Sequence, residues 1–393
     1  MATDIITTVN STVQAQTEAQ TETHVTDDHS FEDPAWLITI NIVIGTCGFL
    51  GNSVVVIVFL ARGKKTFKNW TQMYILHQSS IDCLASMVFL LLRYFNDSAT
   101  LAAGGRRQIL ICKIWFSEYF LWSLFMVSTY NLVLVSLERF LAIVFPVLHR
   151  NHMSRRKVLA TMVVPWLWAF TFQSYWPPVY ELFGTDCFPV WPQRWLQPFF
   201  GVLTFLFEYF LPLMVMLISY GTIIYKLKGM SDKRENQASR MQADTRNSNL
   251  TADPTSYPAI STISNMPTQE NPRTNGTLKP AKKEANIYSK AKQNVVKTLM
   301  TVFIVYVLSW TPTEVEFLLY NLGVIDIDFS GAVYRILSLV VLANMIANPL
   351  IYAGFYKDFQ HSFSRVLSKC KKNRVDVDSQ TVASNSQTLM IPG

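Results

Sequence analysis

Polar side chains occur inside stretches of this chain that are otherwise apolar, and their types could bind a cation. Asp82 lies in the middle of one stretch, Ser128 lies in a second, and Asn344 and Asn348 lie in a third. A carboxylate, a hydroxyl and two amides can hold a small hard cation by their oxygen atoms. They can equally hydrogen-bond one another around water, so the residue types alone leave both interpretations open.

Acids form a second group of chemically active residues. Glu208 lies four residues before Pro212, and Glu314 lies four residues after Trp310. If both segments are helical, each acid is one turn from that neighbour, about 5.4 Å along the helix axis. The acids can pair with nearby bases as part of the structure, or they can bind an external cation. Further acids in these regions are Glu118, Glu181 and Glu316, and the bases are Arg93 and Arg335.

Catalytic chemistry is not indicated by the sequence. The six His residues are scattered along the chain, and no carboxylate pair has a catalytic spacing. No nucleophile has a partnered base in the sequence pattern. The chain is therefore not expected to be an enzyme.

The elements that must position these residues are long apolar runs. Hydrophobic residues make up 50% of the 393 residues and charged residues only 16%, against about a quarter in typical soluble domains. A helix of about 20 apolar residues spans a bilayer, and seven such runs follow one another without an internal repeat. The predicted fold class is all-α, a seven-transmembrane helix bundle. The runs are 36–61, 73–92, 114–137, 158–180, 196–225, 298–320 and 332–355.

The distribution of basic residues predicts the orientation in the membrane. A net charge of +7 could suit a nucleic-acid partner, but residues 1–35 contain no Lys or Arg. Most of the 34 basic residues lie between alternate spans or after the last span. This asymmetry follows the positive-inside rule. We therefore predict an extracellular N-terminus, a cytoplasmic C-terminus and no nucleic-acid partner.

The segments outside the spans are polar. Ser, Thr, Asn, Pro and charged residues dominate residues 229–289, and such a composition buries too little apolar surface to offset the entropy of ordering. We predict a disordered third cytoplasmic loop there, a disordered extracellular N-terminus at 1–35 and a disordered cytoplasmic tail at 371–393. Spans one to five then occupy 36–228, and spans six and seven occupy 290–355.

A short eighth helix is expected after the seventh span. Phe355, Phe359, Phe363 and Leu367 recur every four residues, with basic residues between them. Residues 356–370 are therefore predicted to form an amphipathic helix on the inner membrane surface.

Short motifs occur in order on the seven predicted spans. They are Gly51-Asn52, Asp82, Glu138-Arg139-Phe140 with Pro146, Trp166 or Trp168, Pro212 with Tyr220, Ser309-Trp310-Thr311-Pro312, and Asn348-Pro349-Leu350-Ile351-Tyr352. Together they resemble the motifs of rhodopsin-like (class A) G-protein-coupled receptors, and the chain looks like the peptide-receptor-like subgroup. The resemblance covers residues 36–370 apart from the long loop. Each motif is weak alone, but all of them in order are a specific signal.

The resemblance implies how the inner face works. Arg139 would be held by Glu138 at rest and released to contact a heterotrimeric G protein, which Val147 would also contact. Receptor kinases, arrestin and membrane lipid are the further partners that it implies at the plasma membrane.

The resemblance also implies a switch in spans five to seven. Trp310 would lie beneath the ligand, and the kink at Pro312 would let span six swing outward. Tyr220 and Tyr352 would turn inward and stabilise the active arrangement. Alternatively, the proline kinks are static bends that neighbouring helices compensate. The implied switch residues are Glu138, Arg139, Tyr220, Trp310, Pro312, Asn348, Pro349 and Tyr352.

A sodium pocket is implied as well. Asp82, Ser128, Asn344 and Asn348 would bind an allosteric sodium ion that favours the resting state, and no other cofactor is expected. A channel or transporter that uses Asp82 as an ion site is the alternative function. That alternative does not explain the motifs at the inner face.

The ligand is expected to be a cationic or amidated peptide. Amine receptors of the family carry an acid at the position of Leu121, and opsins carry a lysine on span seven, which is absent here. Both subclasses are therefore disfavoured, and we hypothesise that Glu208 and Glu314 hold the cation. The alternatives are internal pairing with Arg93 and Arg335, or protonated acids. The candidate pocket consists of Glu118, Leu121, Trp122, Glu208, Trp310 and Glu314.

Covalent modifications follow from the predicted orientation. Cys112 and Cys187 both face the exterior, where oxidising conditions permit a disulfide that the resemblance also implies. Sequons at Asn10 and Asn96 face the exterior and are candidate glycosylation sites. Cys370 follows the amphipathic helix in a basic setting and is a candidate for palmitoylation, with a free thiol as the alternative.

Four features depart from the family pattern. The motif Glu138-Arg139-Phe140 replaces the commoner Asp-Arg-Tyr, which keeps the ion pair but loses a hydroxyl. Cys112 lies 27 residues before Arg139, a longer spacing than usual, which leaves the depth of the first turns of span three open. The run from His77 to Asp82 replaces the usual Asn-Leu-Ala start. Lys292 stands where many members have an acid, which predicts that a second clamp on the arginine is missing and that the receptor has some basal activity.

Overall fold

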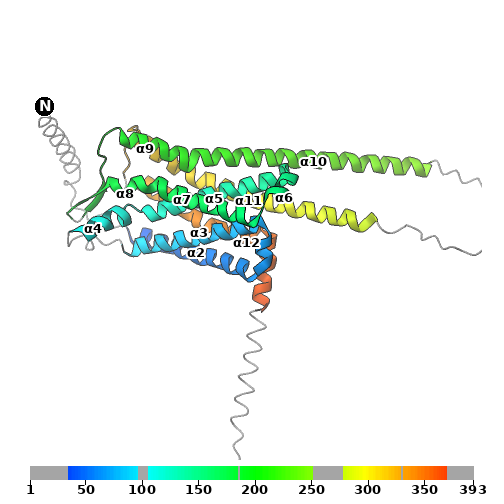
Figure 1. Cartoon of the computed structure of the whole chain (residues 1–393), viewed down its shortest axis with the longest axis horizontal. Coiled ribbons are helices and arrows are strands. Elements are labelled where there is room, and N and C mark those ends of the chain that lie inside the picture. Colours follow the sequence, from blue (N-terminus) through cyan, green and yellow to red (C-terminus); the bar gives the residue numbers. More distant parts are fainter. Residues whose placement is uncertain (1–33, 96–104, 185, 251–277, 329–330, 370–393) are drawn as a thin grey trace, which may run out of the picture. The chain divides into compact units, whose positions relative to one another are not determined.

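The computed structural model describes most of the chain outside its ends and longest loop. The described residues are 34–95, 105–184, 186–250, 278–328 and 331–369 (Figure 1). The chain divides into two units, Met1–Ile40 and Asn41–Gly393. The described part of the first unit contains the start of helix α2 (Ala35–Ala61), and the rest of that helix belongs to the second unit.

In the described part of the chain, six helical segments are long and apolar enough to cross a membrane. A further helix, α7 (Arg155–Phe172), opens with basic residues and is followed by η4 (Gln173–Tyr175) and α8 (Trp176–Val179). Helix α7 covers most of the fourth predicted apolar run, 158–180, and its basic first turn can reach the headgroup region. Each of the seven predicted spans is thus mainly helical, although Tyr180 at the end of the fourth belongs to a strand. The six segments are α2, α3 (Trp70–Tyr94), Arg106–Val144, Leu196–Met230, Gln293–Asn321 and α12 (Ala332–Phe355).

Two helices extend beyond the predicted spans. Both α10 (Leu211–Leu250) and α11 (Leu278–Asn321) enter the segment 229–289 that composition assigned to a disordered loop (Figure 1). The structure corrects that prediction at 229–250 and 278–289. A helix that has formed adds residues at little free-energy cost, and the Lys, Arg, Gln, Glu and Ala residues of these stretches have high helix propensity. The segments 1–33, 251–277 and 370–393 lie outside the described residues.

A small hairpin is absent from the all-α prediction. Strands β1 (Tyr180–Phe183) and β2 (Asp186–Pro189) pair antiparallel, with Leu182 opposite Cys187. Gly184 at the turn has a φ of 64°, a left-handed conformation that glycine adopts without a steric penalty. In the sequence, the hairpin follows α8 directly and precedes α9 (Leu196–Thr204).

Span three begins with an irregular segment. Helix α4 (Arg106–Ile111) passes into the π-helix η3 (Cys112–Phe116), and α5 (Tyr119–Val144) follows. Glu118 lies between them with a φ of 53°, in the left-handed region that residues other than glycine rarely adopt. A π-turn accommodates extra residues within a helix, which explains the long spacing between the outer cysteine and the inner arginine.

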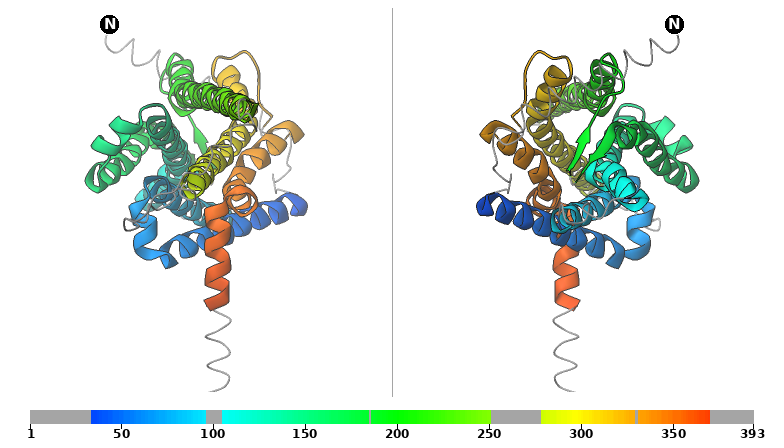
Figure 2. Two further views of the ribbon diagram at one scale, coloured as in Figure 1. Left: turned by 90° about the vertical axis from the view of Figure 1, so that its right-hand side faces the viewer. Right: turned by 90° about the vertical axis from the view of Figure 1, so that its left-hand side faces the viewer.

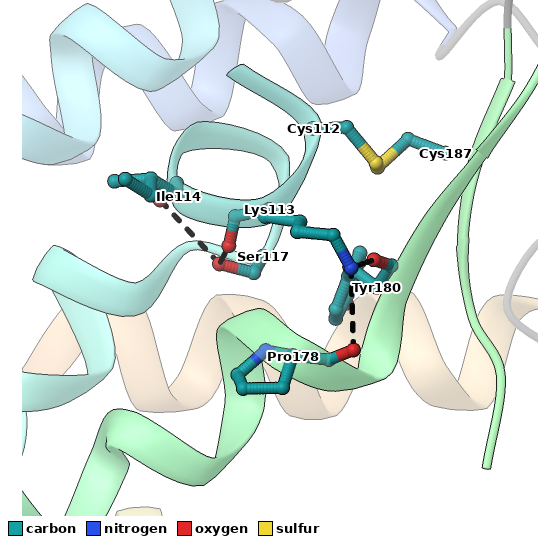
Figure 3. Close-up of a disulfide and its surroundings, with 7 residues drawn as sticks. All are labelled: Cys112, Lys113, Ile114, Ser117, Pro178, Tyr180 and Cys187. Atoms are coloured by element: carbon teal, nitrogen blue, oxygen red, sulfur yellow. Dashed lines mark hydrogen bonds between the residues drawn. A yellow bond between two sulfur atoms is a disulfide. The ribbon is translucent and has the colours of Figure 1, made fainter. Parts of the chain in front are cut away.

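The predicted disulfide is confirmed. Cys112 in η3 is bonded to Cys187 in β2, and their Cα atoms are 5.7 Å apart (Figure 3). Lys113 Nζ donates to the carbonyl oxygen of Tyr180 at 2.7 Å and to that of Pro178 at 3.3 Å (Figure 3). The hairpin and α8 are thus attached to span three by one covalent bond and two hydrogen bonds.

Helix α5 packs against several neighbours. It contacts α3, α7 and α10, while α11 packs along α12 (Figure 2). Phe89 and Tyr306 are buried between the helices, whereas Leu167, Leu308 and Leu350 are exposed. Exposed apolar side chains of this size suit helices that face lipid, since lipid tails are as apolar as leucine.

Pro212 leaves a backbone carbonyl group that a neighbouring helix satisfies. It follows the π-helix η5 (Phe205–Phe210) and lacks the N–H that would bond to the carbonyl of Glu208, four residues earlier. Tyr306 Oη on α11 donates to that carbonyl oxygen at 3.3 Å. The irregular turn in span five is therefore compensated from span six.

Pro349 in α12 shows the same arrangement. Its missing N–H frees the carbonyl of Met345, and Asn52 Nδ2 on α2 donates to that oxygen at 2.9 Å. At Pro212 and Pro349 a neighbouring helix thus satisfies the carbonyl that the proline leaves free, as the alternative of compensated bends requires.

The short helix after span seven is present as residues 357–369, and it turns away from α12 (Figures 1 and 2). Tyr356 and Phe359 pack against Phe59 of α2, with ring centroids 6.4 and 6.1 Å apart. Phe363 and Leu367 are exposed. The helix thus has one apolar edge against the bundle and further apolar side chains that suit a membrane surface.

Candidate functional site

Two buried acids come together in the half of the bundle that carries the disulfide, called here the disulfide end. Glu208 in η5 is 8% exposed and Glu314 in α11 is 5% exposed. The two side chains interact electrostatically. Gln173 Nε2 in η4 donates to Glu208 Oε1 at 2.8 Å. Glu314 Oε2 is buried and has no hydrogen-bond partner among the described residues.

Neither buried acid is neutralised by a base. Among the described residues, no basic side chain forms an ion pair with Glu208 or Glu314. Arg93 instead pairs with Glu118, with 3.5 Å between Nη2 and Oε1. Internal pairing with Arg93 therefore applies to Glu118 and not to the two buried acids. A buried carboxylate without a counter-charge is unfavourable by several kcal/mol, so each acid is either protonated or stabilised by a cation.

Aromatic side chains line the bundle beneath the acids. Trp310 lies one helical turn from the acid on α11, and its ring centroid is 5.6 Å from that of Phe125 and 6.1 Å from that of Tyr306. Trp122 packs against Phe125 at 5.9 Å, and Leu121 is buried in the core. The structure thus links Trp122 to Trp310 through Phe125.

Glu118 lies apart from this group, in the irregular turn before α5. Tyr180 at the start of β1 interacts electrostatically with Glu118, Tyr320 and Tyr334. Of the acids predicted to line one pocket, two are therefore together and the third belongs to a separate cluster beneath the hairpin.

Asp82 is buried and accepts hydrogen bonds from three side chains. Ser128 Oγ donates to Oδ1 at 2.9 Å, and Asn348 Nδ2 donates to Oδ2 at 2.8 Å. Gln78 Nε2 donates to both carboxylate oxygens, at 3.0 and 3.2 Å. Two of the residues predicted to lie with Asp82 are therefore in direct contact with it, together with a glutamine that the sequence analysis does not assign.

Asn344 does not contact Asp82 in this arrangement. Its Nδ2 donates to Ser309 Oγ at 3.0 Å, and Ser309 precedes Trp310 on α11. Because Asn344 lies one turn along α12 from Asn348, it reaches a different neighbour.

The predicted ion pair at the opposite end of α5 is present. Arg139 Nε and Nη2 each donate to a Glu138 oxygen at 2.5 Å. Thr71 Oγ1 and His149 Nε2 also contact the Glu138 carboxylate, each at 3.0 Å. With the histidine tautomer that carries its hydrogen on Nε2, four donors hold one carboxylate that is 2% exposed.

Comparison with known proteins identifies the family. Residues 51–352 match the model of the 7 transmembrane receptor (rhodopsin family), which is well over half of the chain. The chain belongs to this family. It is therefore a multi-pass membrane receptor and not an enzyme.

Individual receptors are similar to this chain in sequence along most of their length. Galanin receptor 2a of Danio rerio is 25% identical over 362 residues, which cover 90% of this chain and 83% of that receptor. Galanin receptor type 1 of Homo sapiens is 26% identical over 361 residues, covering 88% and 85%. The cholecystokinin receptor of Xenopus laevis is 26% identical over 384 residues, covering 88% and 80%.

Two of the residues implied as switch residues, Tyr220 and Tyr352, lie toward the end opposite the disulfide. Tyr220 is buried with its ring 5.4 Å from Phe303 of α11, and Tyr352 is buried with its ring 6.3 Å from Tyr356. Val147, near the start of α6 (Pro146–His152), is 63% exposed. The side chain predicted to contact a G protein is thus accessible on the receptor surface.

Sequence reasoning does not assign Gln78, Thr71 or His149 to the receptor's core contacts. The unusual run from His77 to Asp82 was a visible signal for the glutamine. No signal marks Thr71, because its partner Glu138 is 67 residues away in the chain. Asn10, Asn96 and Cys370 lie outside the described residues, so glycosylation and palmitoylation stay predictions.

Proposed function

We propose that this receptor binds a peptide with a cationic side chain or amidated end from the extracellular side, and that it activates a heterotrimeric G protein. The buried pair Glu208 and Glu314 is the observation that carries this proposal. The similar proteins are named as receptors for galanin and cholecystokinin, which supports a peptide as the ligand.

The chemistry of the acid pair favours a cationic partner. Two acids that interact electrostatically and have no basic partner among the described residues are stabilised in their ionised form when a cation lies between them. Glu314 Oε2 has no hydrogen-bond partner in the described part of the chain, and a guanidinium or ammonium group supplies donors for it. Gln173 holds one Glu208 oxygen and leaves the other oxygen for the ligand.

Coupling to a G protein would use the opposite end of the receptor. Arg139 is held by Glu138, and Val147 is exposed beside them in the chain. A ligand that binds the active state more tightly shifts the receptor toward it, and release of Arg139 then gives the G protein a contact. Receptor kinases, arrestin and membrane lipid are proposed as further partners at the plasma membrane.

The test is a screen of peptides on cells that express the receptor, read by G-protein activation sensors. Peptides with and without Arg, Lys or an amidated end are compared. For an active cationic peptide, Glu208→Gln and Glu314→Gln should each weaken potency about 30-fold, since a charged hydrogen bond contributes about 2 kcal/mol.

Glu316→Gln is the matched control, because Glu316 lies on the same helix but is not part of the buried pair. The potency of the peptide on this variant should equal its potency on the wild-type receptor at equal surface expression. If neutral peptides activate as well as cationic ones, and if both buried-acid variants keep full potency, the acid pair does not bind the ligand.

A further inference from the structure

The surroundings of Asp82 can be compared with what a bound sodium ion needs. The family implies such an ion, and a hard cation is bound by several oxygen atoms that direct their lone pairs toward it. The atoms that face the Asp82 carboxylate in this receptor decide whether its residues fit that requirement.

Three side-chain atoms contact the carboxylate as hydrogen-bond donors, and two of them are nitrogen atoms. Gln78 Nε2 lies 3.0 and 3.2 Å from the two carboxylate oxygens and also contacts Ser128 Oγ. Asn348 Nδ2 lies 2.8 Å from Oδ2, and Ser128 Oγ donates to Oδ1. Amide nitrogen atoms do not bind sodium, so this arrangement does not fit a cation as it stands.

The orientation of the Gln78 amide is fixed by groups that can only accept. The backbone carbonyl oxygen of Tyr74 can only accept, so the Asn131 atom 3.1 Å from it is the donor Nδ2. The same Asn131 nitrogen donates to Gln78 Oε1 at 2.7 Å. With its oxygen engaged there, Gln78 must present its nitrogen to Asp82.

The hydrogen bond at the oxygen of the Asn131 amide is consistent with this orientation. Trp166 Nε1 can only donate, and it donates to His77 Nε2 at 3.0 Å. His77 therefore carries its hydrogen on Nδ1, which donates to Asn131 Oδ1 at 2.8 Å. Every bond from Trp166 to Asp82 thus has its donor on the Trp166 side.

This chain of bonds lies in the dry interior of the receptor. Gln78 and Asn131 are fully buried, and Asp82 and Asn348 are nearly so. From Trp166 to Asp82 each hydrogen bond pairs two buried or partly buried polar groups, and breaking one leaves both unpaired. Asn348 Oδ1, by contrast, is buried without a partner among the described residues. This series of hydrogen bonds connects α7, α3 and α5, and the bond from Asn348 to Asp82 extends it to α12.

We propose that the Gln78 side-chain amide takes the place of a sodium ion at Asp82, so that the resting receptor is held by an internal amide bridge and does not respond to sodium. Gln78 is a positioning residue in this proposal, since it acts through Asp82. The proposal does not depend on which ligand the receptor binds.

The first experiment uses the full-length receptor in detergent and needs no ligand. Its thermal unfolding is measured in sodium chloride and in N-methylglucamine chloride at equal ionic strength. The midpoints should agree to within about 1 °C, and basal nucleotide exchange on a G protein in membranes should be equal in the two salts. A wild-type midpoint that rises with sodium, and that loses this rise in Asp82→Asn, overturns the proposal.

The second experiment removes the amide. Gln78→Ala opens space beside Asp82 and should create sodium dependence, with a midpoint increase of about 3 °C at a tenfold excess of sodium over its dissociation constant. Adding Asp82→Asn should abolish that increase. If Gln78→Ala folds and stays insensitive to sodium, the amide does not mask a cation site. If it does not fold, the wild type and Asp82→Asn still decide between the two outcomes.

Discussion

Glu138 is held by side chains that lie far apart in the sequence. Its carboxylate accepts two donors from Arg139, one from Thr71 on α3 and one from His149 on α6. Thr71 and His149 orient the carboxylate toward Arg139. The sequence pattern at Lys292 predicts a missing clamp and some basal activity, whereas these contacts add restraint from another side.

We therefore predict that removing these contacts raises basal signalling. His149→Ala and Thr71→Val should each increase ligand-independent G-protein activation about fivefold, because losing one hydrogen bond of about 1 kcal/mol shifts the resting equilibrium by that factor. The measurement is basal nucleotide exchange at matched surface expression. His152→Ala is the control, since His152 is exposed on the same helix. Basal exchange equal to that of the wild type in both variants would contradict the orienting role.

At the residue scale, sequence motifs predict pairs that are adjacent in the chain or tied to a known pattern. Glu138 with Arg139 and Cys112 with Cys187 are of this kind, and both are confirmed. The contacts of Asn344 were not predictable from residue type. The Asn344 amide could reach either of two neighbours one helical turn apart. Only the packed structure shows that its Nδ2 lies 3.0 Å from Ser309 Oγ.

Among the elements, span five owes its irregular turn to Pro212. The proline leaves the Glu208 carbonyl without a partner in its own helix, and Tyr306 Oη supplies one. Glu208 is also one of the two buried acids, so the bond fixes the backbone that carries a candidate ligand contact. The hydrogen bond from Tyr306 thus supports both the irregular turn of span five and the position of Glu208.

A double-mutant cycle can isolate that bond. Tyr306→Phe should destabilise the receptor by about 1–3 kcal/mol, because it leaves a buried carbonyl unsatisfied. In a Pro212→Ala background the helix can satisfy this carbonyl itself, so Tyr306→Phe should cost less. Thermal unfolding of the four proteins in detergent gives the coupling free energy, which is expected to be at least about 0.5 kcal/mol. Additive effects would show that the hydroxyl does not compensate the proline.

Apolar run length predicts the seven spans but not their local irregularities. The run that starts at Leu196 contains nothing in its hydropathy that separates η5 from the flanking α-helices. Residues 229–250 are polar enough to be read as a loop, yet they continue α10. Hydropathy reports the solvent that surrounds a segment, whereas helix continuation depends on the turn that precedes it.

At the scale of the whole molecule, the hairpin is anchored to the helices by one set of contacts. The disulfide joins residues that are 75 positions apart, and Lys113 beside it holds the carbonyls of Tyr180 and Pro178. Near β1 lies Glu118, which pairs with Arg93 on α3. The anchoring thus connects α3, the start of span three and the segment after span four.

Loss of the disulfide should therefore weaken the receptor more than loss of the lysine. Closing a loop of this length restricts the unfolded chain by about 4 kcal/mol, whereas the two Lys113 bonds contribute about 1 kcal/mol each. We expect Cys112→Ser combined with Cys187→Ser to lower the thermal midpoint and the amount of receptor at the cell surface, and Lys113→Met to lower them less. Cys47→Ser is the control, since Cys47 is a free, exposed cysteine on α2. A double variant as stable as the wild type would mean that the hairpin is held by its noncovalent contacts alone.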